Sequence, residues 1–191
     1  MSGRTPEARR ARVRELLPEL AYIANDAWRE AVVNIWAEMW EASPWADPSD
    51  CPKHATHVPD LDNVTHTRRV TQQALAIAGV IESHGGEVID RDVLVTAALL
   101  HDVSKMLESE PGPAGPRPSR TGKLVQHAVH GAARAIAHGL PDEVVHVVVG
   151  HTYQSATQPA TPEAVIIHYV DFMDSDLLLL ARDHPLFAKR R

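Results

Sequence analysis

Apolar residues recur every three to four positions along most of the chain, which is the period of one face of an α-helix. No segment alternates apolar and polar residues as a half-buried strand does. The pattern predicts an all-α protein, with about five helices after residue 60 and one or two before it. The predicted helices span about 15–40, 63–83, 91–107, 122–137, 141–153 and 161–182.

Aromatic residues mark one face of the first predicted helix. Trp28, Trp36 and Trp40 stand with Val32 at intervals of four residues. Such a stripe is typical of a helix that packs one face against a core. It also suits a contact between subunits, so the sequence leaves the oligomeric state open.

Capping residues and prolines set the limits of the other predicted helices. Asp62, Asp90 and Thr161 each precede a helix and can accept hydrogen bonds from its first free N–H groups. Prolines cluster in 43–61 and 109–119, which we expect to be loops. The first of these loops is long enough to cover part of a pocket.

The length of the chain, 191 residues, fits a single domain. We expect residues 1–60 to form an N-terminal helical extension that ends in the proline-rich loop. Residues 61–185 should form the helical core. The extension would pack on this core and help to shape its pocket.

Composition and charge narrow the classes of partner. The chain is 44% hydrophobic and 23% charged, with a formal net charge of -6, as in ordinary soluble domains. Basic residues concentrate only near the ends, in "RTPEARRARVR" and "AKRR". We therefore expect neither a nucleic acid nor a membrane as partner. No apolar run of about 20 residues and no signal peptide is found, which predicts a cytoplasmic protein.

Cysteine and histidine usage restricts the chemistry of any metal site. The single cysteine, Cys51, excludes an internal disulfide and every multi-cysteine zinc pattern. Histidine is abundant, with 12 residues. A metal ion would therefore be held by nitrogen and oxygen atoms.

Each predicted core helix brings an ionisable group to its apolar face. One such histidine is more often a hydrogen-bonded core residue than a ligand. Burying six of these groups without partners would cost roughly 1 to 3 kcal/mol each, and a shared metal centre removes that cost. The six residues are His66, His101, Asp102, His127, His151 and Asp171.

Imidazole and carboxylate ligands without thiolates suit iron, manganese, cobalt, nickel or zinc. Six ligands exceed the needs of one tetrahedral ion, so we expect one or two divalent ions. Asp102 can bridge two ions, with His66, His101 and Asp171 on one side and His127 and His151 on the other.

The order His66, His101-Asp102, Asp171 resembles the HD-domain superfamily of metal-dependent phosphohydrolases. The segments "HTRRV", "AALLHDVSK", "HAVHGA", "GHT" and "HYVDF" each look like their counterparts in that family, between about residues 62 and 178. The resemblance implies a helical core and a metal centre that hydrolyses phosphate esters.

In the dinuclear branch of that superfamily, a histidine four residues before Gly-Ala and another before threonine bind the second ion. His127 and His151 match these positions, and His130 competes with His127. Ser104 stands where members with an "HDIGK"-like motif have glycine. The "GYP" motif of the cyclic dinucleotide phosphodiesterases is absent, so we do not assign the chain to them.

Asp102 and Lys105 are the predicted catalytic residues, and Lys105 and Arg69 the predicted phosphate-binding residues. Lys105 is equally well explained as a solvated helix end, and Arg69 as a surface residue. Asp174 is close enough in phase to substitute for Asp171, and His168 could be an outer partner, but we expect neither to bind the metal directly. His54 and His57 could touch substrate from the first loop, although loop histidines are more often solvated.

We expect a phosphohydrolase that uses metal-activated water on a small phosphorylated substrate, a nucleotide or another metabolite. Its dinuclear frame also resembles the mixed-valent diiron oxygenases, which cleave carbon-carbon or carbon-phosphorus bonds. A non-catalytic metal-binding module is the third interpretation. The sequence does not identify the substrate.

Overall fold

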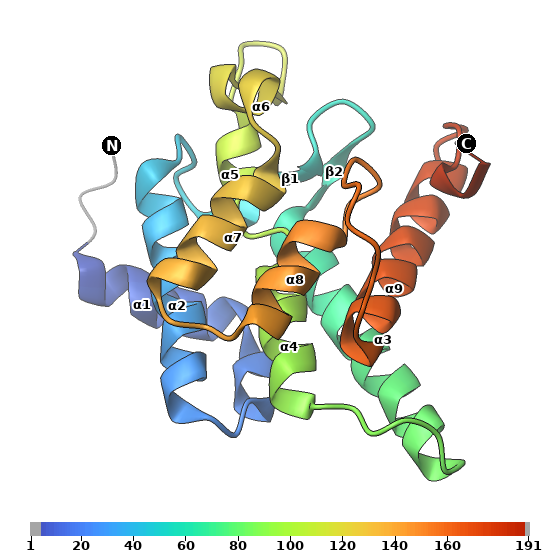
Figure 1. Cartoon of the computed structure of the whole chain (residues 1–191). Coiled ribbons are helices and arrows are strands. Elements are labelled where there is room, and N and C mark those ends of the chain that lie inside the picture. Colours follow the sequence, from blue (N-terminus) through green and yellow to red (C-terminus); the bar gives the residue numbers. More distant parts are fainter. Residues whose placement is uncertain (1–4, 190–191) are drawn as a thin grey trace.

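The computed structural model describes residues 5–189 and confirms the predicted all-α class (Figure 1). Short 3-10 turns lie at Pro18–Tyr22, Pro48–Asp50 and Phe187–Lys189. Within the described residues, no helix is both long and apolar enough to cross a membrane. The helices are α1 (Pro6–Leu16), α2 (Asp26–Ala42), α3 (Asn63–Ser83), α4 (Arg91–Leu100), α5 (Lys105–Glu108), α6 (Arg120–Leu124), α7 (His127–Ala137), α8 (Asp142–Gly150) and α9 (Pro162–Leu180).

The two proline-rich segments contain short strands that the sequence did not predict. β1 (Pro52–His54) pairs antiparallel with β2 (Val58–Asp62), and β3 (Ser109–Glu110) pairs with β4 (Arg117–Pro118). Strands this short have no room for an alternating apolar pattern, which is why periodicity did not detect them. The β1–β2 hairpin leads directly into α3.

The single helix predicted over 15–40 is wrong, because the structure has α1 and α2 with a 3-10 turn between them. Pro18 lacks a backbone N–H and begins the 3-10 turn. Asn25 then caps α2 by accepting hydrogen bonds from the N–H groups of Ala27 and Trp28. The predicted caps Asp62, Asp90 and Thr161 are confirmed: they accept from Thr65, Val93 and Ala164.

Two further predicted helices are interrupted, and both breaks lie next to candidate ligands. The helix predicted over 91–107 ends at Leu100, a turn follows, and α5 begins at Lys105. The helix predicted over 122–137 is broken after Leu124, where Val125 and Gln126 are extended. His101, Asp102 and His127 therefore lie at helix ends.

α4 forms the centre of the hydrophobic core, and every residue from Val93 to Leu100 is buried. α2, α3, α8 and α9 all contact it (Figure 1). Trp36 on α2 is buried and donates from Nε1 to the carbonyl oxygen of Leu99 at 2.8 Å. The tryptophan stripe is thus part of the core, with Trp36 and Trp40 buried and Trp28 packed at its edge.

Helical periodicity aligns Ile77 with His66, Leu124 with His127, and three valines of α8 with His151, and so predicts that all of them are buried. Ile77 and Leu124 are exposed instead. Ile77 is 37% exposed, although Ala74 and Ala78 on the same helix are buried in the core. Leu124 is 65% exposed, because the break after it separates α6 from α7 and removes it from the face of His127. The predicted contacts of Val144, Val147 and Val148 on α8 with the core are confirmed.

Candidate metal centre

The six candidate ligands converge on one buried region, although they come from five separate places in the chain. His66 lies on α3, His127 at the start of α7 and Asp171 on α9. His101 and Asp102 follow the end of α4, and His151 follows the end of α8. All six residues are buried. They form two sets that share Asp102, and within each set the candidate ligand atoms lie within 4.8 Å of one another. The first set is His66, His101, Asp102 and Asp171, and the second set is Asp102, His127 and His151.

The turn after α4 explains how two neighbours in sequence can face one point. Adjacent residues inside a helix point about 100° apart. Here the helix ends at Leu100, and Asn63 donates from Nδ2 to the carbonyl oxygen of Asp102 at 3.0 Å. The hydroxyl of Ser104 donates to the carbonyl oxygen of His127. The serine that departs from the glycine-containing motif therefore joins this turn to α7.

The carboxylate of Asp102 lies between the two sets. Its Oδ2 atom is 3.4 Å from Nε2 of His66 and 3.6 Å from Nε2 of His101. Its Oδ1 atom is 3.2 Å from Nε2 of His127 and 3.4 Å from Nε2 of His151. One oxygen thus serves each set, which is the arrangement of a bridging carboxylate.

Hydrogen bonds to carbonyl oxygens fix two of the imidazole rings. Nδ1 of His101 is 2.7 Å from the oxygen of Ala98, and Nδ1 of His151 is 2.8 Å from the oxygen of Val148. A carbonyl oxygen only accepts, so both Nδ1 atoms carry the proton. In the neutral rings, each Nε2 atom then presents a lone pair to the centre.

The other two rings are held by carboxylates that contact their Nδ1 atoms. Nδ1 of His66 is 2.8 Å from Oδ2 of Asp174, and Nδ1 of His127 is 3.4 Å from Oε1 of Glu108. Arg69 forms an ion pair with the other oxygen of Asp174 at 2.7 Å. Outer partners of this kind orient the histidine ligands of metal ions.

The donor atoms of these side chains are of the kinds that bind divalent cations. Nε2 of His127 and Nε2 of His151 are 3.2 Å apart, and the same atoms of His66 and His101 are 3.4 Å apart. Lone pairs that face each other at these distances repel unless a proton or a cation lies between them. Oδ1 of Asp102 is buried, and no hydrogen-bond partner for it is found among residues 5–189. A shared cation in each set would satisfy all of these atoms.

The two carboxylates and His101 are in the protonation states that bind a cation. Burial would raise the pKa of Asp102, but Lys105 and Lys53 outweigh it and hold that pKa well below its usual range. Burial also opposes the charged form of Asp171, whose pKa is likewise lowered, chiefly by Lys53. Burial lowers the pKa of His101 to about 3, so its imidazole is neutral near pH 7. The carboxylates are thus ionised and His101 is neutral, as metal ligands must be.

Two residues of the centre were missed by the sequence analysis. Lys53 on β1 places Nζ 3.0 Å from Oδ2 of Asp102. Glu108 lies one turn after Lys105 and accepts a hydrogen bond from it at 3.2 Å. The spacing of Lys105 and Glu108 on one helical face could have indicated their pairing. Lys53 lies in an aperiodic loop, and no signal pointed to it.

Lys105 lines the cavity as a buried side chain, with Nζ 3.8 Å from Oδ1 of Asp102. A solvated helix end is therefore the wrong description of it. Although burial favours the neutral amine, Asp102 and Glu108 raise the pKa of Lys105. Its ammonium group is charged and next to the centre.

Arg69 requires a correction, because it does not line the cavity and its guanidinium faces Asp174. Asp174 and His168 do not belong to either set of candidate ligands, in agreement with the expectation for both. His168 instead lies 3.2 Å, through Nδ1, from the carbonyl oxygen of His151. His130 also falls outside both sets, whereas His127 belongs to one.

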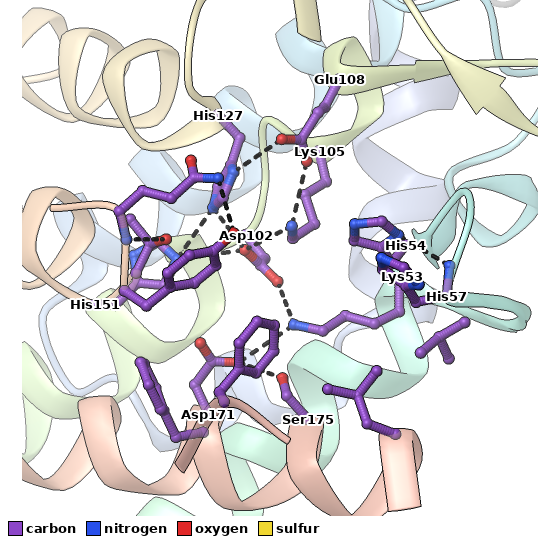
Figure 2. Close-up of a pocket in the computed structure, with 17 residues that line it drawn as sticks. Lys53, His54, His57, Asp102, Lys105, Glu108, His127, His151, Asp171 and Ser175 are labelled. Carbon is purple, nitrogen blue, oxygen red and sulfur yellow. Dashed lines mark hydrogen bonds and ion pairs between the residues drawn. The ribbon is translucent and has the colours of Figure 1, made fainter. Parts of the chain in front are cut away.

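The centre opens into a cavity of about 120 Å³ (Figure 2). Its floor carries Asp102, Lys105, Glu108, His127, His151 and Asp171. His54, His57 and Val58 line it from the β1–β2 hairpin, so the first loop contributes to the pocket as predicted. Tyr153, Phe172 and Phe187 form an aromatic wall, with ring centroids 4.9 Å apart for Tyr153 and Phe187 and 5.8 Å for Phe172 and Phe187.

Two curated proteins are similar to this chain. A dihydroneopterin 2',3'-cyclic phosphate phosphodiesterase from Methanocaldococcus jannaschii is 32% identical over 115 residues, which cover 60% of this chain and 46% of that protein. The 3'-5' exoribonuclease YhaM of a Geobacillus strain is 30% identical over 106 residues, which cover 49% of this chain and 32% of that protein. The chain thus spans less than half the length of either relative. No solved structure is significantly similar to it.

The family assignment rests on a match that covers more than half of the chain. The family model described as "HD domain" matches residues 63–176. This segment begins at the start of α3 and ends within α9, so it contains all six converging side chains. An HD domain implies a divalent metal ion, which agrees with the donors found here. The chain belongs to the HD domain family.

Proposed function

We propose that this chain is a metal-dependent phosphohydrolase that cleaves a phosphodiester bond in a small molecule. One observation carries the proposal: Asp102 divides its two oxygens between two histidine sets at the floor of a cavity. The names of both relatives, a cyclic phosphate phosphodiesterase and an exoribonuclease, support a diester over a monoester.

The proposed ligands are His66, His101, Asp102 and Asp171 for one ion, and Asp102, His127 and His151 for the other. When bound, divalent ions supply Lewis acidity for the phosphoryl group and lower the pKa of a coordinated water. Iron, manganese, cobalt, nickel and zinc all suit this donor set. The carboxylate of Asp102 holds the two sets together and is therefore indispensable.

Lys105 is the proposed phosphate-binding residue. Its ammonium group lines the cavity beside Asp102 and is held there by Glu108 at 3.2 Å. A fixed positive charge next to the centre can stabilise the negative charge that develops on a phosphoryl group. Glu108 also contacts His127, so this carboxylate positions both a ligand and the phosphate-binding lysine.

The cavity favours a small substrate with a planar or apolar portion. Its volume of about 120 Å³ is small beside the roughly 300–1,000 Å³ of most small-molecule sites, which favours a small substrate. The aromatic wall of Tyr153, Phe172 and Phe187 can contact a flat ring, while the phosphate faces the polar floor. The net charge of -6 disfavours a polynucleotide, which is bound by basic surfaces.

The experiment is a metal reconstitution assay. Chelator-treated protein receives Mn²⁺, Co²⁺, Ni²⁺, Zn²⁺ or Fe²⁺ and is tested on bis(p-nitrophenyl) phosphate, p-nitrophenyl phosphate and 2',3'-cyclic nucleotides, with and without dioxygen. We expect diester hydrolysis with a redox-inert ion and without dioxygen, and none after Asp102→Asn. Circular dichroism should show that this variant keeps its helices.

Two results would contradict the proposal. Turnover that requires both iron and dioxygen would indicate an oxygenase of the same dinuclear type. Metal binding without turnover of any ester would indicate a binding module. Lys123→Met, a change at an exposed lysine on α6, serves as a control and should hydrolyse the diester at the wild-type rate.

A further inference from the structure

The ammonium group of Lys53 lies where three of the four side chains of the first set converge. Nζ is 2.6 Å from Nε2 of His66, 3.0 Å from Oδ2 of Asp102 and 3.2 Å from Oδ1 of Asp171. Figure 2 shows this side chain reaching from the hairpin toward Asp102 and Asp171. These three atoms are the ones that would bind the first ion.

An ion and this ammonium group exclude each other. Divalent ions bond to nitrogen and oxygen ligands at about 2.0–2.2 Å, so an ion shared by the three side chains would overlap Nζ. The two cations would also repel each other. Lys105 does not compete in this way for the second set, because it lies 3.8 Å from Oδ1 of Asp102 and is hydrogen-bonded to Glu108.

The displaced ammonium group can move into the cavity. Lys53 lines the cavity together with Lys105, and its side chain is 10% exposed. A flexible four-carbon stem lets the ammonium group swing without moving the β1–β2 hairpin. Once outside the first set, the group lies in the cavity that a phosphorylated substrate must enter.

We propose that Lys53 alternates between two positions. In one it takes the place of the first ion, and in the other it binds the phosphate of the substrate beside Lys105. An ion that enters the first set drives the change, so the second set fills at a lower metal concentration. The phosphate-binding position rests on the proposed function, whereas the competition with metal does not.

Metal affinity tests the competition without any assay of turnover. In a His127→Ala background the second set is incomplete, so Mn²⁺ titration calorimetry reports mainly on the first set. Adding Lys53→Met should tighten Mn²⁺ binding about tenfold, the factor expected if the ammonium group occupies the set in nine molecules of ten. Adding Lys123→Met instead should change nothing. Equal affinities with and without Lys53 would overturn the proposal.

The kinetics of Mn²⁺ association distinguish displacement of the Lys53 ammonium group from its electrostatic repulsion of the ion alone. If the ammonium group must leave first, the observed rate of Mn²⁺ association reaches a plateau at the rate of its departure. Lys53→Met should abolish this plateau in stopped-flow measurements. A rate that rises linearly with Mn²⁺ concentration while Lys53 is present would show that charge alone acts, and the two positions would be wrong.

Inorganic phosphate tests the second position. With both sets saturated by Mn²⁺, Lys53→Met should weaken phosphate binding about tenfold, which is the loss expected for one charged hydrogen bond. Unchanged phosphate affinity would confine Lys53 to the metal set and refute its role toward substrate. If the wild-type protein binds Mn²⁺ but neither binds phosphate nor cleaves an ester, the proposed function fails while the metal competition stands.

Discussion

Each imidazole of the centre is oriented by an acceptor at its Nδ1 atom. Backbone carbonyls hold His101 and His151, while Asp174 holds His66 and Glu108 holds His127. Arg69, which does not reach the cavity, keeps Asp174 in place. The residue that appeared in the sequence as a phosphate-binding candidate thus acts through a carboxylate and a histidine.

Asp174→Asn should weaken metal binding by about 10- to 100-fold, the usual cost of losing an outer partner of a histidine ligand. The physical reason is that a neutral amide polarises His66 less and releases Arg69. Mn²⁺ calorimetry measures this effect, and circular dichroism checks the fold. The control is Asp26→Asn, which changes an exposed carboxylate paired with Arg29 on α2. Equal affinities in wild type and Asp174→Asn would show that Asp174 does not support the ligands.

The six converging residues could be predicted because each belongs to a periodic element or its end. Helical projection places side chains by phase, although Asp174 is close enough in phase to Asp171 to remain a possible substitute. Lys53 could not be predicted in this way, because its position depends on the path of the β1–β2 hairpin across the cavity. The role of Ser104 depends equally on a contact with His127 that no sequence spacing reveals.

At the scale of elements, helix ends rather than helix middles deliver most of the candidate ligands. α4 and α8 both stop one residue before a histidine, and α7 starts with one. Periodicity predicted that these helices exist but did not predict the breaks between α4 and α5 and between α6 and α7. The breaks depend on tertiary contacts, such as the hydrogen bond from Asn63 to the turn after α4.

Gly122 on α6 allows the close approach of α5. A Cβ atom at this position would lie 2.2 Å from the carbonyl oxygen of Glu108. Gly122→Ala must therefore displace the backbone of Glu108 and its contacts with Lys105 and His127. We expect a loss of about 1–3 kcal/mol in the free energy of unfolding and weaker binding of the second ion. Urea unfolding and Mn²⁺ calorimetry measure the two effects, and wild-type values in both would contradict this packing.

At Gly79, in the last third of α3, a Cβ atom has room. The nearest atom to a Cβ built there is Nη2 of Arg91, at 3.8 Å, so alanine fits without displacement. Gly79→Ala should raise the free energy of unfolding by about 0.5–1 kcal/mol, because alanine has the higher helix propensity. Urea unfolding of the metal-free protein measures it. A destabilised variant would indicate that α3 is not a regular helix at this point.

At the scale of the whole molecule, helices from both ends of the chain pack into the main hydrophobic core, and this packing positions the polar centre. α1 and α2 contribute to the same core as α4, α8 and α9. The β1–β2 hairpin, which precedes the region matched by the family model, adds Lys53 and one wall of the cavity. The centre is therefore built by the fold as a whole.

We propose that Asp102 bridges two metal sites. The most direct test is elemental analysis after saturation with Mn²⁺ and removal of free metal, counting ions per chain in the wild type and in His127→Ala. We expect about two ions in the wild type and about one in the variant, because only the second set is lost. Wild-type protein without bound metal, or a variant that still holds two ions, would contradict it.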